Sequence, residues 1–329
     1  MKYTRLAYDR ADAELAARKL RSNEERAERL SEIRVKAPEI YELQRSLTAS
    51  NYSILKAISR GDTRNVRAEL DKIAENNLSV QQTIGSMLKA FGYDEDYLKY
   101  HYYCPICEDT GFHEGLRCSC YTKLLESYTT RELNESCSIT LNDFSDFRLD
   151  LYPVTMGSLS PREHMRGVYA DCRAYADNFS ENSASLFFFG KTGLGKTFLS
   201  SCIAKQLLDR GSNVFFGSIL KLLRQIEDER FRRKEGDTTE VIIGADLVIL
   251  DDLGSEFQTS FTDSVLYEII NERINLNKPT IISTNLSAKE LDNKYNDRIV
   301  SRLTGCFLPI MFIGSDVRQE KRKLGFGDS

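Results

Sequence analysis

The stretch "SLFFFGKTGLGKTFLSSCIAKQLLDRG", residues 185–211, decides the fold. An apolar run of strand type ends at Gly190, a glycine-rich loop follows, and a helical pattern opens at Lys196-Thr197. Residues 190–197 spell G-x-x-x-x-G-K-T, and the strand before and the helix after the loop are the context that this phosphate-binding motif requires. This context disfavours a plain glycine-rich turn and predicts a nucleotide site.

Each residue type in this loop has a physical task. Gly190, Gly193 and Gly195 let the backbone turn tightly so that its N–H groups approach phosphates, and the helix N-terminus adds partial positive charge. We expect Lys196 to reach the β- and γ-phosphates and the Thr197 hydroxyl to ligate Mg²⁺. Nucleotide contacts are predicted for Gly190, Lys191, Thr192, Gly193, Leu194, Gly195, Lys196, Thr197 and Phe198.

From about residue 160, short apolar runs alternate with helical patterns, which is typical of a parallel sheet with helices on both faces. In "DLVILDD", residues 246–252, two carboxylates follow four apolar residues. Because ligands bind at the carboxyl ends of parallel strands, we expect Asp251 to hold the Mg²⁺ shell and Asp252 to orient or deprotonate the attacking water. The five predicted strands are "SLFFF", "NVFFG", "DLVIL", "TIIST" and "FLPIMFI".

Another predicted strand, "PTIISTN", ends in Ser283-Thr284-Asn285. A polar side chain at that strand end is expected near the γ-phosphate, where it would report the presence of that phosphate. An ordinary turn is the alternative, because asparagine is common in turns.

The order of these motifs resembles that of the AAA+ ATPases. After G-K-T, D-D and S-T-N come "DRIVSRLTG" and "FIGSDVRQEK". Over about residues 140–325 the series is similar to bacterial replicative-helicase loaders of the DnaI/DnaC type and to the related transposition helper ATPases of the IstB type. The resemblance implies an α/β fold, an AAA+ P-loop core with a five-stranded parallel sheet. It also implies ATP hydrolysis, a hexameric replicative helicase and single-stranded DNA as partners, and self-association through the ATP interface.

The resemblance also implies roles for single residues. Asn285 matches the first sensor, Arg302 the arginine finger and Arg318 the arginine of the second sensor. An arginine finger neutralises transition-state charge at the nucleotide of a neighbouring subunit; the alternative for Arg302, and for Arg298 one turn earlier, is a surface salt bridge. The catalytic set expected is Lys196, Asp251, Asp252, Asn285, Arg302 and Arg318.

Two features depart from many AAA+ enzymes. Asp252 stands where many of them carry glutamate, and its side chain is one methylene shorter, so we expect slow turnover that suits a switch better than a motor. Few residues follow Arg318, so no helical lid is expected.

Residues 1–95 have a charged, helical composition with few β-branched residues. Helices are predicted for "DAELAARKLRSNEERAERLSEIRVKA", "PEIYELQRSLTASNYSILKAIS" and "TRNVRAELDKIAENN". Ser79 and Gln82 resemble a capping box that starts a further helix. The region is either a helical bundle with solvated charges or a docking module for a partner protein.

Four cysteines lie close together in "CPICEDTGFHEGLRCSC". Clustered cysteines in a cytosolic chain suggest a metal, and four thiolates suit a structural tetrahedral Zn²⁺. The open alternatives are a redox pair, plain thiols, or replacement of one cysteine by His113 or, less well, His101. The predicted zinc ligands are Cys104, Cys107, Cys118 and Cys120.

The chain has 329 residues, of which 41% are hydrophobic and 29% charged, with a formal charge of −4. This charge excludes a globally basic nucleic-acid coat but permits a local basic groove. No segment approaches the roughly 18 apolar residues that a membrane helix needs, and the N-terminus lacks the apolar core of a signal peptide. We therefore expect a cytoplasmic protein without membrane contact.

One basic loop, "DERFRRKEG" at residues 228–236, places Arg230, Arg232, Arg233 and Lys234 around Phe231. Such a loop would contact single-stranded DNA through phosphates and stacking; a solvated helix end is the alternative.

The sequence divides into a helical partner-binding region (1–99), a zinc-binding module (100–123), a linker (124–154) and an AAA+ ATPase domain (155–329). We expect the linker to pack through Phe144, Phe147 and Tyr152. The predicted function is ATP-dependent loading of the replicative helicase onto single-stranded DNA during replication initiation or restart. One rival is a transposase-helper ATPase on duplex DNA, against which the cysteine insert argues. The other is a small-molecule P-loop kinase, which needs neither Arg302 nor Asn285.

Overall fold

The computed structural model describes residues 3–59, 63–137, 140–231 and 236–323, and leaves the side chains of 50–70 and 136–139 undescribed. The chain forms two compact units: the sheet unit, Met1–Ala11 with Thr122–Ser329, and the N-terminal unit, Asp12–Tyr121. Among the described residues, no helix combines the length and apolar character needed to cross a membrane.

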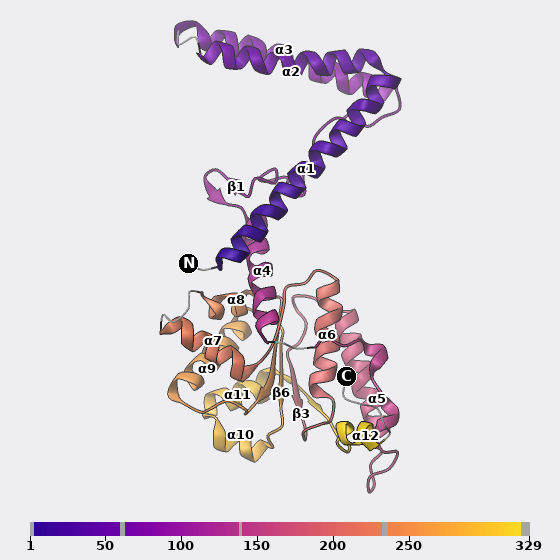
Figure 1. The fold of residues 1–329 in the computed structure, drawn as a ribbon, viewed down its shortest axis with the longest axis vertical. Helices are drawn as coiled ribbons and strands as arrows, with labels where there is room; N and C mark the ends of the chain where they lie inside the picture. The colour runs from indigo at the N-terminus through magenta and orange to yellow at the C-terminus, as the bar shows by residue number, and fades with distance from the viewer. Residues whose placement is uncertain (1–2, 60–62, 138–139, 232–235, 324–329) are drawn as a thin grey trace. The chain divides into compact units, whose positions relative to one another are not determined.

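A five-stranded parallel sheet forms the centre of the sheet unit, with the strand order β4-β5-β6-β3-β7 (Figure 1). All five predicted strands are confirmed, as is the α/β fold class. The strand that leads into the phosphate loop, β3, lies between β6 and β7. The phosphate loop therefore follows an inner strand of the sheet and not one of the two outer strands. The bounds are β3 Leu186–Phe189, β4 Val214–Ser218, β5 Leu247–Leu253, β6 Thr280–Thr284 and β7 Leu308–Met311.

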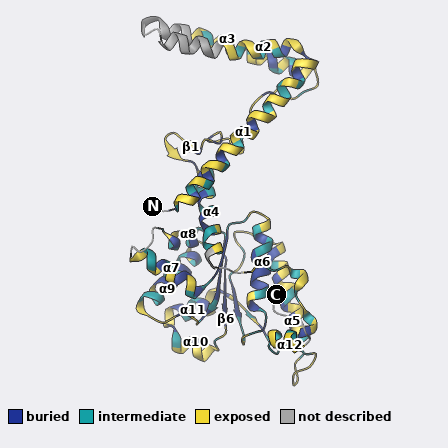
Figure 2. Cartoon of the chain, in the orientation of Figure 1, coloured by how far each residue is buried: buried dark blue, intermediate teal, exposed yellow. Residues whose placement is uncertain are grey.

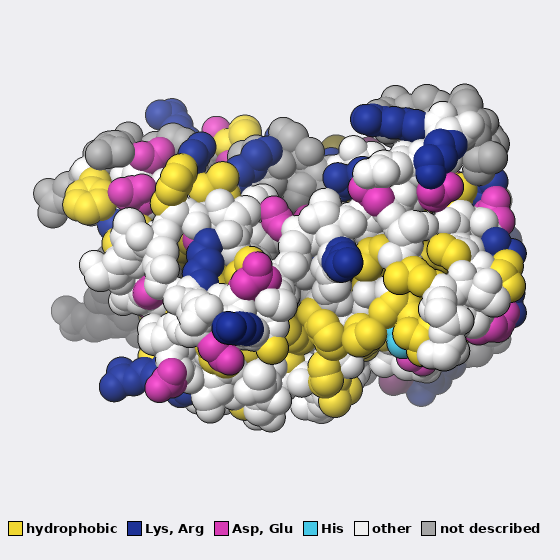
Figure 3. All heavy atoms as spheres, turned by 90° about the horizontal axis from the view of Figure 1, so that it is seen from below, with side chains coloured by type: hydrophobic (Ala, Val, Ile, Leu, Met, Phe, Trp, Pro, Cys, Tyr) yellow, Lys and Arg dark blue, Asp and Glu magenta, His cyan; other side chains and the backbone are white. Residues whose placement is uncertain are grey.

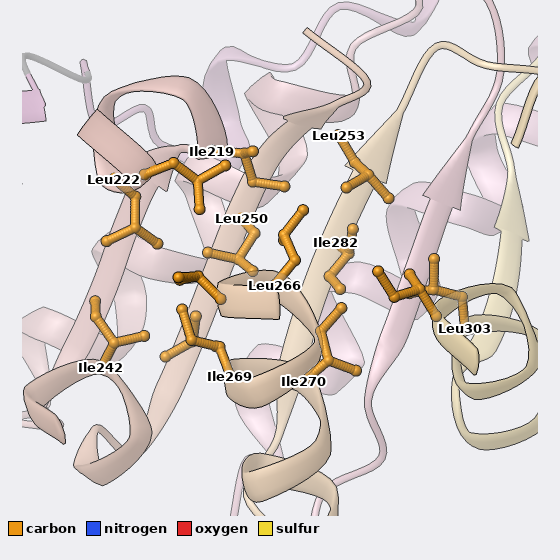
Figure 4. Packing of buried hydrophobic residues seen from close by; sticks show 14 of the residues in the cluster. Ile219, Leu222, Ile242, Leu250, Leu253, Leu266, Ile269, Ile270, Ile282 and Leu303 are labelled. Atoms are coloured by element: carbon orange, nitrogen blue, oxygen red, sulfur yellow. The ribbon is translucent and has the colours of Figure 1, made fainter. Parts of the chain in front are cut away.

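Alternate residues of these strands face two separate hydrophobic cores, because successive side chains of a strand point to opposite faces. Phe187, Leu250 and Ile282 pack against α7, α8, α9, α10 and α11 (Figure 4), whereas Phe188 and Ile249 pack against α5 and α6. Figure 2 shows the buried strands between exposed helix faces. The helices are α5 Pro161–Asp177, α6 Lys196–Asp209, α7 Ile219–Arg230, α8 Thr238–Gly244, α9 Ser260–Asn275, α10 Ala288–Lys294, α11 Asp297–Cys306 and α12 Val317–Lys323.

The segment before this core begins with a helix and continues without long regular elements. Helix α4 (Ser119–Cys137) is followed by two short 3-10 helices, η1 (Phe144–Asp146) and η2 (Leu149–Leu151). Phe144, Phe147 and Tyr152 pack here as the sequence predicts, because Phe147 lies 5.7 Å from Tyr152 and 5.4 Å from Tyr169 between ring centroids.

Long helices make up most of the N-terminal unit: α1 (Arg5–Lys36), α2 (Pro38–Ser59) and α3 (Thr63–Ala90). The prediction of a new helix start at Ser79 is wrong, since α3 runs through it without a break. Neither glycine nor proline lies between residues 63 and 84 to stop the helix. A two-stranded hairpin of β1 (Phe112–His113) and β2 (Leu116–Arg117) completes the unit.

A buried arginine connects the segments that lead into β5 and β6. Arg273, at the end of α9, is 0% exposed. Its guanidinium donates to the carbonyls of Ile242, Ile243 and Ala245 at the end of α8, and to Pro279 just before β6. Burial lowers its pKa to about 9. The cation therefore satisfies backbone carbonyls that would otherwise be buried without a donor.

We expect Arg273→Met to lower the free energy of unfolding by about 3 kcal/mol or more, because several buried carbonyls lose their donor at once. Urea unfolding followed by circular dichroism measures this change. The matched control is Arg224→Met on the exposed side of α7, which should shift stability by less than about 0.5 kcal/mol. Equal stability of the two variants would contradict the prediction.

Candidate nucleotide-binding site

A cavity of about 580 Å³ opens at the carboxyl ends of β3, β5 and β6. It brings together the phosphate loop, the acidic pair and the end of β6, as the sequence predicts for parallel strands. Its walls come from five separate parts of the chain. The lining residues are Thr140, Asn142, Asp146, Phe147, Arg148, Leu151, Tyr152, Thr192, Gly193, Leu194, Gly195, Lys196, Thr197, Phe198, Asp251, Asp252, Ser283, Asn285, Val317, Arg318 and Lys321.

Two glycines of the loop have positions that a larger residue would not fit. Gly190 has φ +144°, and a Cβ there would lie 2.4 Å from the carbonyl oxygen of Phe312. Gly193 has φ +80°, and a Cβ there would lie 2.2 Å from the carboxylate of Asp316. The backbone of the loop is thus held closely by the segment after β7, to which Gly193 also accepts a 2.9 Å hydrogen bond from the Val317 N–H.

The ammonium of Lys196 is the buried cation of the site, at 6% exposure. Its Nζ donates to the carbonyls of Gly190 (2.6 Å) and Lys191 (2.8 Å) and to Oδ1 of Asn285 (2.6 Å). Burial lowers the pKa of Lys196 to about 8, against the opposing effect of Asp251 and Asp252. The side chain is therefore held at the mouth of the loop where an anion would stabilise its charge.

The first aspartate of the pair belongs to a hydroxyl network. Thr197 Oγ1 donates to Asp251 at 3.1 and 2.9 Å, and Ser283 Oγ donates to Asp251 at 2.5 Å. Asp251 is 9% exposed, so its carboxylate is fixed by these neighbours. A carboxylate beside a threonine hydroxyl is an oxygen-donor set that suits Mg²⁺, and the residues present fit the predicted cation.

The second aspartate is held by the predicted sensor. Asn285 Nδ2 donates to Asp252 Oδ1 at 2.6 Å, while the Asp252 N–H donates to Ser283 Oγ at 3.0 Å. Asp252 has φ +62°, a left-handed conformation that is uncommon for residues other than glycine but is enriched among asparagine and aspartate. Burial and the nearby Asp251 raise its pKa, which favours a group that accepts a proton. Asn285 thus connects Lys196 and Asp252 directly.

Several lining residues escaped sequence reasoning. Phe147, Arg148 and Tyr152 from the segment before the core line the cavity, and so does Lys321 of α12. Tyr152 donates its hydroxyl to the Leu194 carbonyl at 2.8 Å, which buttresses the loop. The one sequence signal was the aromatic spacing of the segment, which predicted packing but not proximity to the nucleotide.

The two predicted arginines lie in different places. Arg318 lines the cavity. Arg302 does not, because its Nε and Nη2 donate to Asn271 Oδ1 at 2.9 and 2.5 Å and its guanidinium lies 4.7 Å from the Tyr267 ring centroid. Its side chain is therefore positioned on the α9–α11 face.

Part of the predicted DNA loop falls outside the described residues, namely Arg232, Arg233 and Lys234. Of its neighbours, Arg230 pairs with Glu268 at 2.5 Å and lies over the Phe261 ring, and Phe231 is 61% exposed. On the face that Figure 3 shows, the Lys and Arg side chains of the described residues are scattered among Asp and Glu. A DNA contact remains a prediction.

The four predicted zinc ligands converge in the N-terminal unit, where their sulfur atoms all lie within 4.8 Å of one another. The Sγ atoms of Cys104 and Cys118 are 3.8 Å apart and those of Cys107 and Cys120 are 3.4 Å apart. Zinc–sulfur bonds of about 2.3 Å place the sulfurs of a tetrahedron about 3.8 Å apart, so the group fits Zn²⁺ and contains no disulfide.

The loop around the cysteines is built for this arrangement. Hydrogen bonds from the backbone at Cys107 and Ile106 lower the pKa of Cys104 to about 7, which favours its thiolate, whereas burial raises the pKa of Cys107 and Cys120. The buried carboxylate of Asp109 accepts from the N–H groups of Tyr103 and Cys104, both at 2.9 Å. His113 lies exposed in β1 outside this group of ligand atoms, so the geometry favours four cysteines over a histidine replacement.

Nucleotide binding should take up a proton at high pH. Below about pH 8 the free protein already carries the Lys196 charge; above it the free protein loses the proton, and phosphate binding must restore it. We expect affinity for Mg-ATP to fall about tenfold from pH 7 to pH 9. Calorimetry in two buffers of different ionisation heat should show uptake of about one proton at pH 9 and almost none at pH 7; no uptake at pH 9 would contradict this assignment.

The purified chain should contain about one zinc per molecule. Cys107→Ser should remove most of it, because a closed four-ligand site loses a thiolate. Elemental analysis by mass spectrometry checks the content. Cys306→Ser, an exposed cysteine of α11, is the matched control and should keep the zinc. Equal zinc in both variants, or none in the wild type, would disprove the site.

Comparison with known proteins supports the nucleotide site. Residues 171–308 match the family described as IstB-like ATP binding protein. The replicative helicase loader DnaC of Escherichia coli (strain K12) is 24% identical over 177 residues, which are 53% of this chain and 65% of DnaC. The replicative helicase loader DnaI of Bacillus subtilis (strain 168) is 25% identical over 119 residues, 36% of this chain and 38% of DnaI. The match thus spans less than two thirds of each relative.

Among solved structures, the match to the DnaC helicase loader covers 52% of this chain and 98% of the DnaC chain, with a TM-score of 0.44 and 22% identity. Domain III of the Thermotoga maritima replication initiation protein DnaA covers 57% of this chain and 78% of its own, with a TM-score of 0.45 and 20% identity. The predicted AAA+ fold class agrees with the five-stranded parallel sheet. The sheet unit is therefore similar to IstB-like ATP binding proteins and to the helicase loaders DnaC and DnaI, as its motifs predict.

Proposed function

We propose that this chain is a cytoplasmic ATP-dependent loader that places the replicative DNA helicase on single-stranded DNA during replication initiation or restart. The observation that carries the proposal is the hydrogen-bonded chain from Lys196 through Asn285 to Asp252, beside the Thr197–Asp251 pair. Because the relatives are named replicative helicase loaders, we infer that the partner of this nucleotide switch is a replicative helicase.

The residues of the site divide the work between binding and sensing. Bound ATP with Mg²⁺ would supply the phosphoanhydride bond whose hydrolysis resets the switch. Lys196 neutralises phosphate charge, and Thr197 and Asp251 supply oxygen ligands for the cation. Asp252 orients a water molecule and accepts its proton, which its raised pKa favours. We propose slow hydrolysis, because aspartate reaches less far than glutamate at this position.

Asn285 gives the switch a means to sense the nucleotide. Its amide bonds both Lys196 and Asp252, so attraction of the lysine toward phosphate must break or redirect one of these bonds. A nucleotide then has different contacts in two states of the protein, which is the energetic requirement for a ligand-driven change.

Self-association is proposed from the position of Arg302. A finger must reach the γ-phosphate, yet Arg302 is not among the residues that line its own cavity. A head-to-tail neighbour would bring the α9–α11 face of one copy to the cavity of the next, an arrangement that generates rings or open helical assemblies.

The N-terminal unit is proposed to bind the helicase, with zinc as a structural element. With zinc bound, the four cysteines would hold the hairpin and loop at 104–120 in one conformation and would leave no open coordination position. A small stapled module with long helices is suited to protein docking. Single-stranded DNA is proposed to contact the basic loop at 228–236.

A second candidate is a transposase-helper ATPase that assembles on duplex DNA. It is favoured by the family match itself, which is to IstB-like ATP binding proteins over residues 171–308. The same site chemistry serves both functions, so the partner distinguishes them.

The ATPase rate should separate these functions when it is measured alone, with single-stranded DNA, with duplex DNA and with the replicative helicase of the native host. A loader should be slow alone and stimulated several-fold by single-stranded DNA or the helicase. Lys196→Ala is the control for contaminating activity. Stimulation by duplex DNA alone would favour the transposase helper and overturn the loader.

Mixing two inactive variants should test the shared site. Lys196→Ala removes the phosphate-binding charge and leaves Arg302, whereas Arg302→Ala does the reverse. Each alone should lose about 10³-fold or more of the ATPase rate. Their mixture should recover part of the rate, because mixed interfaces contain one intact half from each. A mixture as inactive as its components would contradict a site between subunits.

A further inference from the structure

A buried polar cluster that the proposed chemistry does not use lies behind the acidic pair. Glu256 is 5% exposed and Tyr295 is 4% exposed, and Lys294 lies beside them. Burial of a carboxylate costs free energy, and the attraction within a buried ion pair is seldom large enough to offset this desolvation penalty. Glu256, Lys294 and Tyr295 are here called the Glu256 cluster.

The cluster is connected on one side to Asp252. After Asp252 the chain turns through Gly254, which has φ +109° and would place a Cβ 2.7 Å from the Leu286 side chain. The Gly254 N–H donates to the Glu256 carboxylate at 3.0 Å, and the Ser255 N–H donates to the Asp252 carbonyl at 3.1 Å. Glu256 is therefore bonded to the turn that follows the proposed catalytic aspartate, through contacts that do not involve Tyr295.

On the other side the cluster is connected to α11. The Tyr295 hydroxyl donates to the Glu256 carboxylate. Lys294 Nζ donates to the carbonyls of Gly254 and Glu256 and lies 3.6 Å from Glu256 Oε1. Lys294 is the last residue of α10 and Tyr295 is its C-cap. Asn296 follows, and its side chain caps α11 by accepting from the Ile299 N–H at 3.1 Å. That helix carries Arg302.

These contacts connect the segment of Asp252 with the helix of Arg302, and the two residues are proposed to serve different nucleotide sites. Asp252 acts at the cavity of its own copy, and Arg302 is proposed to act at the cavity of a neighbour. A movement of the Asp252 turn must carry Glu256, and with it the start of α11, because every bonding partner of the Glu256 carboxylate in this set is on one of these two segments.

We propose that Glu256 and Tyr295 are positioning residues for the arginine finger: they set the orientation of α11 according to the state of the copy's own acidic pair. The proposal rests on the shared site of the proposed function. The buried carboxylate of Glu256 would then serve communication between neighbouring ATP sites.

The test places Tyr295→Phe in one or the other member of the mixed pair. In the Lys196→Ala copy, which donates the finger, the substitution should lower the recovered ATPase rate about tenfold with little change in KM. In the Arg302→Ala copy, which donates the phosphate loop, it should leave the recovered rate within about twofold. With Glu256→Gln in the finger donor, the recovered ATPase rate should lie between these two values. The glutamine amide keeps an acceptor for Gly254 or Tyr295 but lacks the charge.

The outcomes separate the inference from the function on which it rests. No recovery in the mixture without Tyr295→Phe would overturn the shared site, and the inference with it. Recovery that is lowered equally in both placements, or in neither, would overturn the inference alone. Circular dichroism and urea unfolding of each variant check folding; a Tyr295→Phe protein that unfolds would be replaced by Lys294→Met, for which the same asymmetry is required.

Discussion

The buried charge of Lys196 is the constraint on which the site depends. A cation at 6% exposure must have partners, and it finds them in two loop carbonyls and in Asn285, at the end of a different strand. Asn285 in turn donates to Asp252, and Ser283, two residues earlier in β6, donates to Asp251. Three strand ends are thereby fixed around one cavity, and the parallel order of the sheet makes this possible because all carboxyl ends meet at the same edge.

The core and the phosphate loop could be predicted from sequence because local pattern determines them. Strands such as "DLVIL" carry apolar residues on both faces and end at polar residues, and the loop motif requires a strand before it and a helix after it. The convergence of the four cysteines was predictable for the same reason, since the spacing of possible metal ligands is local. Helix α3 was predicted in two pieces because a serine with a glutamine three residues later imitates a cap, whereas the uninterrupted helix-forming residues of that segment decide the outcome.

Other features depend on contacts between distant segments and left no local signal. Tyr152 reads as a packing aromatic, yet its hydroxyl supports the phosphate loop 42 residues later. Glu256 belongs to none of the sequence motifs, yet its carboxylate is buried and accepts hydrogen bonds from Tyr295 and Gly254. Such side chains acquire their role only when the fold brings a second segment to them, and the proposed link between neighbouring ATP sites belongs to this class.

The central claim is that a triphosphate and its magnesium are bound between the loop at Lys196 and the strand end at Asp251. The most direct measurement is calorimetric titration of ATP with and without Mg²⁺ into the wild type and Asp251→Asn. The account predicts one nucleotide per chain, with an affinity that Mg²⁺ increases in the wild type and hardly changes in the variant. An equal effect of Mg²⁺ on both proteins, or no heat of binding in the wild type, would contradict it.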